Sequence, residues 1–410
     1  MTALHRKLLR ELWQMKGQAL AICLVIACGV ATFVMSLCTL ESLQRTQQMY
    51  YGAYHFAQVF AHLKRAPEAV AARIAEIPGV AQVQTRIVEQ VTLDVPALPE
   101  PAVGRLISLP GRSGMDLNAR YLRKGRQLDP SRGGEVLVSE GFASAHGIQS
   151  GDSIRAVLNG RLQTLRMVGV ALSPEHIYAI REGDLLPDER RFGVFWMGYQ
   201  EMAAAFDMQG AFNDVCLTLS PGASEPEVIR RLDRILEPYG GLGAYGRDDQ
   251  PSHKFVSNEL KELRGMAIIV PTIFLLVAAF LLHVVVSRLV NTQREQIAAL
   301  KAFGYSRLEI VTHYLHLVLF IVLMGVMLGT IVGARLGWSV THLYTRFFHF
   351  PVFAFHLASD VVLKALLVSV GVGLVGTLTA VARAASLPPA EAMRPEPPAR
   401  YGPTLLERFG

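Results

Sequence analysis

ALAICLVIACGVATFVMSLCTL, residues 19–40, contains no charged side chain. As an α-helix this segment is about 33 Å long, which is enough to cross the hydrocarbon core of a bilayer. A cleaved signal peptide has a shorter apolar core, of about 7 to 15 residues. The segment therefore predicts a retained transmembrane helix close to the N-terminus.

Three more apolar segments of similar length lie in the last third of the chain, at residues 266–286, 311–336 and 361–381. Each is long enough to span a membrane with some tilt. Residues 41–265, between the first segment and the second, are mostly polar. The predicted fold class is membrane α-helical, with four transmembrane helices and a large mixed α/β extracytoplasmic domain inserted between helices 1 and 2.

Basic residues indicate the orientation, because short loops rich in Lys and Arg stay in the cytoplasm. They gather in residues 1–18, 287–310 and 382–410, which we expect to be a cytoplasmic N-terminus, a cytoplasmic loop and a cytoplasmic Pro-rich tail. These basic residues are Arg6, Lys7, Arg10, Lys16, Arg288, Arg294, Lys301, Arg307, Arg383 and Arg394. Both termini are therefore expected inside, and residues 41–265 outside.

The short extracytoplasmic loop, residues 337–360, is rich in aromatic side chains. Such rings suit the interface between membrane and water, so we expect them there on the outer face. They are Trp338, Tyr344, Phe347, Phe348, Phe350, Phe353 and Phe355.

Composition argues against several classes of function. The chain is 51% hydrophobic and 18% charged, the average of a very apolar part and an ordinary globular part. The net charge of +6 is explained by the cytoplasmic flanks, so no nucleic-acid partner is expected. Cys23, Cys28 and Cys38 lie in the first span, which leaves Cys216 without a disulfide partner in the extracytoplasmic domain. The sequence shows no metal-ligand cluster, so no metal site is expected.

The extracytoplasmic domain alternates between strand and helix patterns at its two ends. Residues 56–100 contain a strand, a helix and one long alternating segment at residues 80–95, and residues 214–250 repeat this order. The intervening residues 101–200 are rich in short strands and turns. We predict one subdomain built from the two β-α-β units, with a β-rich subdomain inserted between them.

The cytoplasmic loop contains the most specific local sequence, REQIAALKAFGYSRLE at residues 294–309. Ile297, Leu300 and Gly304 share one face of a short helix, and Ala298 falls off that face. Two interpretations stay open. The helix is either an ordinary interfacial connector of two spans or a docking helix for a cytoplasmic partner.

The ends of this short helix carry recognisable caps. Gly304 suits a left-handed C-terminal cap, because glycine adopts positive φ without strain. Ser306 and Glu309 have the Ser-x-x-Glu spacing of a capping box, which predicts a fresh helix start leading into the third span.

Glycines recur every four residues in the third span, at Gly325, Gly329, Gly333 and Gly337. Small residues at this spacing let helix backbones approach closely, either within one subunit or between subunits. The spans contain no carboxylate, which argues against a secondary transporter with a proton or ion relay.

These features together resemble the FtsX-like permeases of ABC transporters, of the MacB and LolC/LolE type. The resemblance covers nearly the whole chain and rests on the span pattern, on REQIAALKAFGYS, and on PPAEAMRP after the last span. It implies a porter-like subdomain of two β-α-β units with a β-rich insertion. It assigns contact with the ATPase, the role of a coupling helix, to Arg294, Glu295, Ile297, Leu300, Lys301, Ala302, Phe303 and Gly304. It places the motif after the fourth helix on Pro389, Ala390, Glu391, Ala392 and Arg394.

The resemblance implies a permease subunit of an ATP-driven ABC transporter of the mechanotransmission type. Such a subunit couples ATP hydrolysis on a separate chain to movement of the extracytoplasmic domain, for export or extraction of a lipoprotein, lipid, peptide or drug. MacB fuses its ATPase to the permease, but this sequence has no Gly-x-x-x-x-Gly-Lys-(Ser/Thr) loop. We therefore expect a non-catalytic chain without a bound cofactor, with ATP and Mg on the partner ATPase.

Partners and location follow from the same resemblance. The expected partners are a cytoplasmic ABC ATPase, a second permease unit in a homodimer, heterodimer or tandem, a periplasmic adaptor protein and the lipid bilayer. The expected location is the bacterial inner membrane. The alternative from another class is a membrane sensor whose outer domain binds a ligand and signals inward, although only about 24 residues separate spans two and three. An intramembrane enzyme would need a convergent nucleophile or carboxylate pair, which the spans lack.

Overall fold

Two compact units make up the chain, of which the computed structural model describes residues 3–95, 98–110, 116–129, 132–181, 183–184, 186–345, 347–352 and 355–386. The first, called here the helical unit, comprises Met1–Cys38, Arg264–Trp338 and Leu357–Gly410. The second, the α/β unit, comprises Thr39–Leu263 and Ser339–His356.

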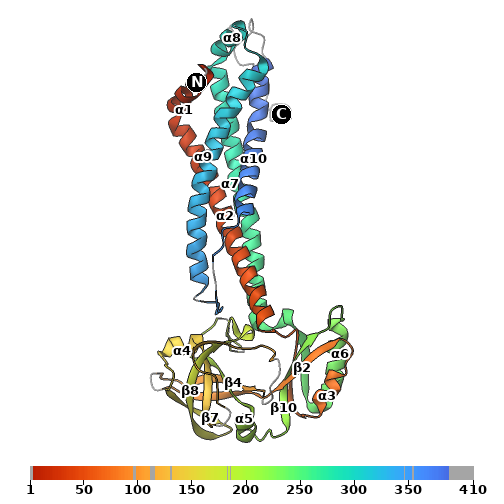
Figure 1. Cartoon of the computed structure of the whole chain (residues 1–410). Helices are drawn as coiled ribbons and strands as arrows, with labels where there is room; N and C mark the ends of the chain where they lie inside the picture. Colours follow the sequence, from red (N-terminus) through yellow and green to blue (C-terminus); the bar gives the residue numbers. More distant parts are fainter. Residues whose placement is uncertain are drawn as a thin grey trace, which may run out of the picture. The chain divides into compact units, whose positions relative to one another are not determined.

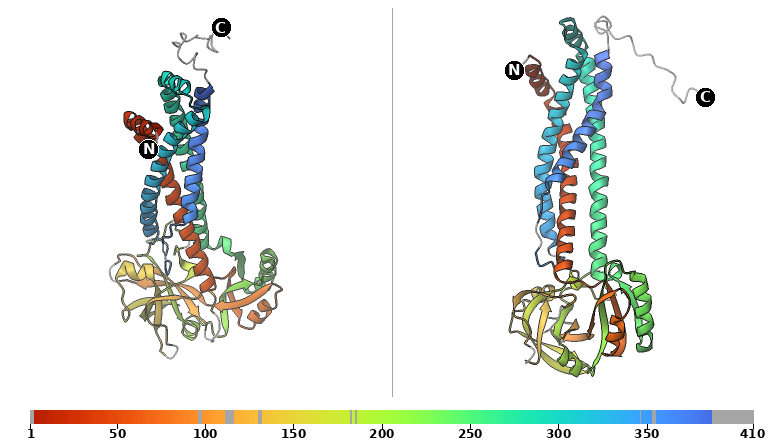
Figure 2. Two further views of the ribbon diagram at one scale, coloured as in Figure 1. Left: turned by 45° about the horizontal axis from the view of Figure 1, so that its top comes forward. Right: turned by 45° about the vertical axis from the view of Figure 1, so that its right-hand side comes forward.

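Four of the described helices are long and apolar enough to cross a membrane: α2 (Lys16–Ala53), α7 (Pro251–Thr292), α9 (Arg307–Tyr344) and α10 (Ser359–Ser386). Within the helical unit they run side by side (Figures 1 and 2). Two shorter helices, α1 (Ala3–Gln14) and α8 (Arg294–Ala302), complete this unit. The predicted fold class is confirmed, with a mixed α/β unit between the first long helix and the second.

The glycines of α9 pack against α2 of the same chain. A Cβ atom added at Gly325 would lie 2.8 Å from the Ile26 side chain, and one at Gly329 would lie 2.7 Å from the carbonyl oxygen of Ala27. Gly333 approaches α2 in the same way one turn further on, and Gly337 is buried. The close approach that the four-residue spacing predicts therefore occurs within one subunit at the first three positions.

A four-stranded antiparallel sheet forms one part of the α/β unit, with the order β11 (Gly241–Gly246), β1 (Val59–Pro67), β10 (Ala211–Leu219) and β2 (Val80–Arg86). Helices α3 (Val70–Ala75) and α6 (Glu225–Leu236) cover one face of it (Figure 1). Val228, Leu232 and Leu236 recur every four residues on α6, so their side chains form the buried stripe that packs on the sheet. Along the chain, each of these helices lies between two strands of the sheet, in the orders β1-α3-β2 and β10-α6-β11.

A seven-stranded sheet forms the other part. Its order is β5 (Tyr121–Gly125), β8 (Arg161–Leu172), β6 (Glu135–Ser139), β9 (Phe192–Gly198), β4 (Ala102–Leu109), β3 (Val88–Asp94) and β7 (Ser153–Leu158). Strand β7 also pairs with β8, so the sheet closes on itself. Helices α4 (Glu140–His146) and α5 (Tyr199–Ala205) pack against it, and Phe142, Phe195 and Met202 are among the buried residues of its core.

The predicted boundary of the first β-α-β unit, at residue 100, differs from the structure. The alternating residues 80–95 form two strands in different sheets, β2 and β3, with the fully buried Ile87 between them. A period-two pattern continues unchanged when a chain passes from one sheet to the next, so the sequence pattern does not show this change. The first unit of the four-stranded sheet ends at Arg86.

Residues 339–356 of the aromatic loop belong to the α/β unit, and two of their rings are buried in protein instead of facing the membrane interface as expected. Phe348 and Phe350 are only 6% and 4% exposed, and Phe348 stacks on Tyr344 with 5.7 Å between ring centroids. Arg123 of β5 donates hydrogen bonds to the carbonyl oxygens of Phe350 and Pro351. An aromatic ring is stabilised either at a membrane interface or in a protein core, and Phe348 and Phe350 lie in the core. Phe353 lies outside the described residues.

Candidate functional site

Helix α8 ends in a Schellman motif. Gly304 has φ +90°, the left-handed conformation that its sequence position predicts. The backbone N–H of Tyr305 donates to the carbonyl of Leu300 at 3.1 Å, and that of Gly304 donates to Lys301 at 3.0 Å. These bonds satisfy two carbonyls that the end of a helix leaves without partners. The turn after α8 is therefore fixed by its backbone.

The helix start that follows has the geometry of a capping box. The backbone N–H of Ser306 donates to Oε2 of Glu309 at 2.7 Å, and the N–H of Glu309 donates to Oγ of Ser306 at 3.3 Å. These reciprocal bonds satisfy two donors at the start of α9. The link from α8 to α9 is thus fixed by a turn and by the helix start that follows it.

The exposed side of α8 differs from the face that the sequence suggests. Ile297 is 3% exposed and Ala298 is fully buried, so both pack into the helical unit rather than face a partner. Helical spacing alone does not show which side of a short helix its own bundle covers. The most exposed apolar side chains of the loop are Phe303, at 84%, and Leu308, at 72%. The exposed residues of the predicted coupling segment are Glu295, Ala302, Phe303 and Gly304. The predicted motif at Pro389, Glu391 and Arg394 lies outside the described residues.

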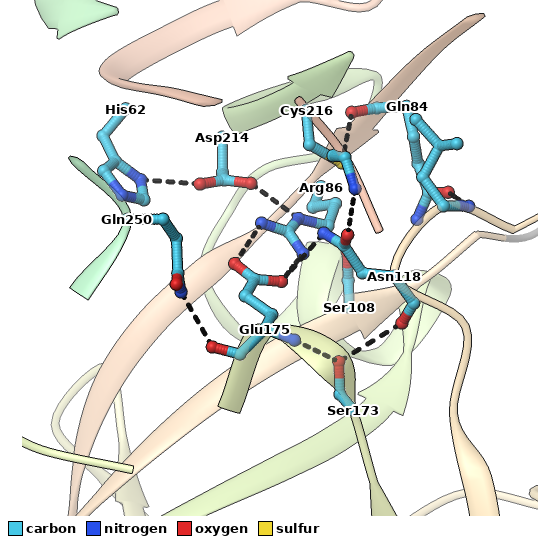
Figure 3. A network of polar contacts seen from close by, with 12 residues as sticks. His62, Gln84, Arg86, Ser108, Asn118, Ser173, Glu175, Asp214, Cys216 and Gln250 are labelled. Atoms are coloured by element: carbon cyan, nitrogen blue, oxygen red, sulfur yellow. Dashed lines mark hydrogen bonds and ion pairs between the residues drawn. The ribbon is translucent and has the colours of Figure 1, made fainter. Parts of the chain in front are cut away.

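A second polar site lies in the α/β unit and centres on Arg86, whose side chain is 4% exposed (Figure 3). Its Nε lies 2.6 Å from Oδ1 of Asp214 on β10, and its Nη1 and Nη2 contact both carboxylate oxygens of Glu175 at 2.6 and 2.9 Å. Glu175 belongs to the single turn Pro174–His176 that follows β8. The network therefore joins the four-stranded sheet to the segment after β8 of the seven-stranded sheet.

Further hydrogen bonds complete this network. Nδ2 of Asn118 donates to the carboxylate of Glu175 at 3.0 Å, and Nε2 of Gln250 donates to the Glu175 carbonyl at 2.8 Å. Burial works against ionisation of Asp214 and Glu175, but the charge of Arg86 more than offsets it and lowers the pKa of both carboxyls. Both groups are therefore charged and paired.

A cavity of about 320 Å³ lies beside the network, and His62, Arg105, Glu175, Tyr178, Tyr245 and Phe255 are among its lining residues. The carboxylates of the network already bind Arg86, and none is paired with a hydroxyl or thiol nucleophile in the described residues. No group of three or more His, Cys, Asp or Glu could hold a metal ion in the part of the chain that the structure describes. We interpret the network as a structural brace.

The sequence does not predict this brace. His62, Arg86, Glu175 and Asp214 are far apart in the chain, and a single charged residue within a strand is common on solvated sheet faces. One sequence feature points toward the brace: Asp214 is a carboxylate within the largely apolar strand β10, where the structure buries it. A buried carboxylate requires a partner, but its identity depends on the pairing of the strands.

The contact between His62 and Asp214 predicts a pH dependence of stability. Nδ1 of His62 lies 2.6 Å from Oδ2 of Asp214. Burial lowers the pKa of His62, but the hydrogen bond and charge of Asp214 outweigh this and raise it above 6.5. The protonated pair therefore stabilises the folded state below pH 6.5, and this contribution is lost as the pH rises through the folded-state pKa. His176 and His253 have lowered pKa values, so their contribution to stability rises with pH, mainly below about pH 6.5, and is opposite in sign to that of His62.

Thermal unfolding of the intact chain in detergent, from about pH 6.5 to about pH 8.5, tests this expectation. The free energy of unfolding of the α/β unit should fall with pH, by no more than about 1 kcal/mol because the imidazole is 40% exposed. His62→Gln should remove this slope. An unchanged slope in the variant would show that another group is responsible.

Residues 268–389 match the FtsX-like permease C-terminal family. They form an FtsX-like permease domain. This permease domain contains the segment REQIAALKAFGYS, on which the sequence resemblance partly rests, together with α8 and its caps. The resemblance to FtsX-like permeases is thereby confirmed for residues 268–389.

Comparison of the whole chain with solved structures gives neighbours of its α/β unit. The periplasmic region of MacB from Actinobacillus actinomycetemcomitans is 10% identical, with a TM-score of 0.31, and the match covers 50% of this chain and 92% of that one. The extracellular domain of the noncanonic ABC-type transporter YknZ from Gram-positive bacteria is 14% identical, with a TM-score of 0.31. That match covers 46% of this chain and 98% of that one.

A third neighbour is a domain of a putative permease protein from Porphyromonas gingivalis, at 14% identity and a TM-score of 0.29, covering 46% of this chain and 88% of that one. At these TM-scores the likeness carries no functional conclusion. A search of curated proteins finds no match.

Proposed function

We propose that the chain is the permease subunit of an ATP-driven ABC transporter and that α8 is its coupling helix. The observation that supports this is the position of α8 inside the permease domain, with its C-terminal end closed by the Schellman turn and Phe303 exposed beside that turn. A rigid short helix with an exposed ring is suited to a groove on a partner ATPase. The ATPase would bind ATP and Mg, and this chain would bind neither.

The long helices supply a route for movement. Helices α2, α7 and α9 continue without interruption from the helical unit into the α/β unit, which contains Thr39–Ala53 of α2, Pro251–Leu263 of α7 and Ser339–Tyr344 of α9. A displacement of α8 would pass directly into α7 and α9, its neighbours along the chain. Mechanotransmission of this kind would act on a substrate such as a lipoprotein, lipid, peptide or drug outside the membrane. A second permease unit and a periplasmic adaptor would complete the assembly.

This proposal places α8 in the cytoplasm of a bacterium and the α/β unit on the other side of the inner membrane. Single cysteines at the exposed residues Thr164 and Gln296, in a chain without its native cysteines, test the orientation. An impermeant thiol reagent on intact spheroplasts should label the cysteine at Thr164 and not the one at Gln296. Labelling of both, or of Gln296 alone, would contradict the orientation.

The coupling role of α8 is tested by replacing Phe303 with serine. Burying a phenylalanine in a partner groove contributes about 1.5–3 kcal/mol, so Phe303→Ser should weaken binding of the partner ATPase by roughly ten- to hundredfold. The measurement is the affinity of the detergent-solubilised chain for an ABC ATPase recovered by co-purification, with stimulation of ATP hydrolysis as a second readout. The chain alone should hydrolyse no ATP.

Leu242→Ser provides the matched control, because Leu242 is 75% exposed and lies on β11 of the α/β unit. This variant should bind and stimulate the ATPase normally. Equal losses in both variants would point to general instability, and full activity of Phe303→Ser would exclude α8 as the docking element. If the unaltered chain stimulated no ATPase, the interpretation as a ligand-binding sensor would be favoured.

A further inference from the structure

A buried carboxylate attaches α1 to the rest of the helical unit. Glu11 is 3% exposed, and its Oε2 lies 2.9 Å from Nε2 of His313 on α9, whose side chain is 4% exposed. Its Oε1 pairs with Nζ of Lys7, one turn earlier on α1, at 3.3 Å. An ionised carboxylate is buried only where charged or hydrogen-bonding partners replace its water. The contact with His313 is therefore a specific attachment of α1 to α9.

The same carboxylate reaches the start of α8. The side chain of Gln293 lies close to Glu11, and the hydroxyl of Tyr314, the residue next to His313 on α9, donates to Oε1 of Gln293 at 2.8 Å. Gln293 is 7% exposed and Tyr314 is 1% exposed. We call Glu11, Gln293, His313 and Tyr314 the Glu11 cluster. It brings together α1, α9 and the residue that precedes α8.

Gln293 is the whole joint between α7 and α8, since α7 ends at Thr292 and α8 begins at Arg294. Its backbone, with φ −100° and ψ +18°, is outside the helical range, and its carbonyl oxygen accepts a hydrogen bond from the N–H of Ile297 at 2.9 Å. The direction of α8 relative to α7 is therefore set at one residue. Within the Glu11 cluster, Tyr314 holds the side chain of that residue, and Glu11 binds the neighbouring His313.

We propose that Glu11 and His313 are positioning residues of the coupling helix, and that α1 is a working part of the coupling machinery. By attaching α1 to α9 beside Tyr314, which binds Gln293, they fix the direction in which α8 leaves α7. When α8 moves, α1 and α9 then move with it, and the backbone of Gln293 between α7 and α8 does not bend. This proposal rests on the function proposed above for α8.

The geometric part of the proposal is tested without any partner. Spin labels at the exposed residues Arg10 and Gln296, in a cysteine-free chain in nanodiscs, report the distance between α1 and α8. The unaltered chain should give one narrow distance peak. Glu11→Ala and His313→Gln should lose this peak and give a broad distribution. His316→Gln is the matched control, because His316 lies three residues further along α9 and is exposed.

The functional part uses the stimulation of the co-purified ATPase. A hydrogen bond to a buried charged group shifts an equilibrium by roughly tenfold or more, so Glu11→Ala should lose about tenfold in stimulation while still binding the ATPase through Phe303. Glu11→Gln should retain stimulation, because its amide oxygen still accepts the hydrogen bond from His313. Tyr314→Phe removes only the bond to Gln293 and should show a partial loss in a chain that folds normally.

The outcomes separate the two proposals. If the unaltered chain stimulates no ATPase, the function proposed for α8 fails, and the distance measurement still decides whether Glu11 positions α8. If Glu11→Ala keeps the narrow peak and full stimulation, Glu11 has no positioning role. Loss of the peak in His316→Gln as well would attribute the effect to general loosening of α9 and would overturn the proposal.

Discussion

Arg86→Met is expected to destabilise the α/β unit by about 3–5 kcal/mol, because it leaves two buried carboxylates without their counter-charge. Asp214 is fully buried and Glu175 is 8% exposed, so neither regains water unless the fold opens. The loss would be a large fraction of the stability of a domain of this size. Thermal unfolding followed by tryptophan fluorescence measures it, since Trp196 is 3% exposed and is the single tryptophan of the α/β unit.

Two comparisons make this expectation specific. Arg230→Met removes an exposed ion pair with Glu227 on α6 and should change stability by less than about 1 kcal/mol. The triple variant Arg86→Met, Glu175→Gln, Asp214→Asn carries no unpaired buried charge and should recover part of the lost stability. If Arg86→Met unfolded at the same temperature as the unaltered chain, the brace would contribute nothing to folding.

Gly304→Val is expected to weaken coupling strongly without preventing membrane insertion. A Cβ at Gly304 would meet no atom within 4 Å, so the whole cost comes from the backbone, which holds φ at +90°. A β-branched residue resists this conformation by about 1–2 kcal/mol, a factor of roughly 5 to 30 in an equilibrium. The Schellman hydrogen bonds should open and α8 should tilt. Stimulation of the partner ATPase should fall by a similar factor, while Ser306 and Glu309 still start α9.

The matched control for this variant is Gly304→Asn, because asparagine tolerates the left-handed conformation better than other residues. It should keep most of the stimulation. Equal activity of Gly304→Val and the unaltered chain would show that the turn geometry is irrelevant to coupling. Ala298→Val, which helical spacing alone suggests as a silent control, is unsuitable: Ala298 is fully buried, and overpacking there costs about 1–3 kcal/mol.

Local patterns predicted the features of this chain that depend on neighbouring residues. Uncharged segments gave the four spans, since their length and hydropathy are local properties. The left-handed Gly304 and the bonds between Ser306 and Glu309 also follow from residues within one or two turns of each other. The alternating strand and helix patterns at the two ends of the α/β unit are local for the same reason. The predicted end of the first β-α-β unit, residue 100, lies beyond Arg86, where the structure ends it.

Features that depend on the pairing of distant segments were missed. In the brace, the bond between Arg86 and Asp214 joins residues 128 positions apart, and the bond between Glu11 and His313 joins residues 302 positions apart. The burial of Phe348 follows from the α/β unit taking up part of the loop between α9 and α10, a choice that composition does not reveal. Likewise, Ile297 points inward because the bundle covers that side of α8.

The closure of the seven-stranded sheet limits how another chain can add to the α/β unit. Because β7 pairs with both β3 and β8, the six strands of the ring have both neighbours and offer little free backbone for strand addition. The described strands paired on one side alone are β5 of this sheet and β2 and β11 of the other. Three of the six residues of β11 are glycine, which weakens it as a template. Among the described strands, β2 and β5 are therefore the edges best suited to pair with a strand of another chain.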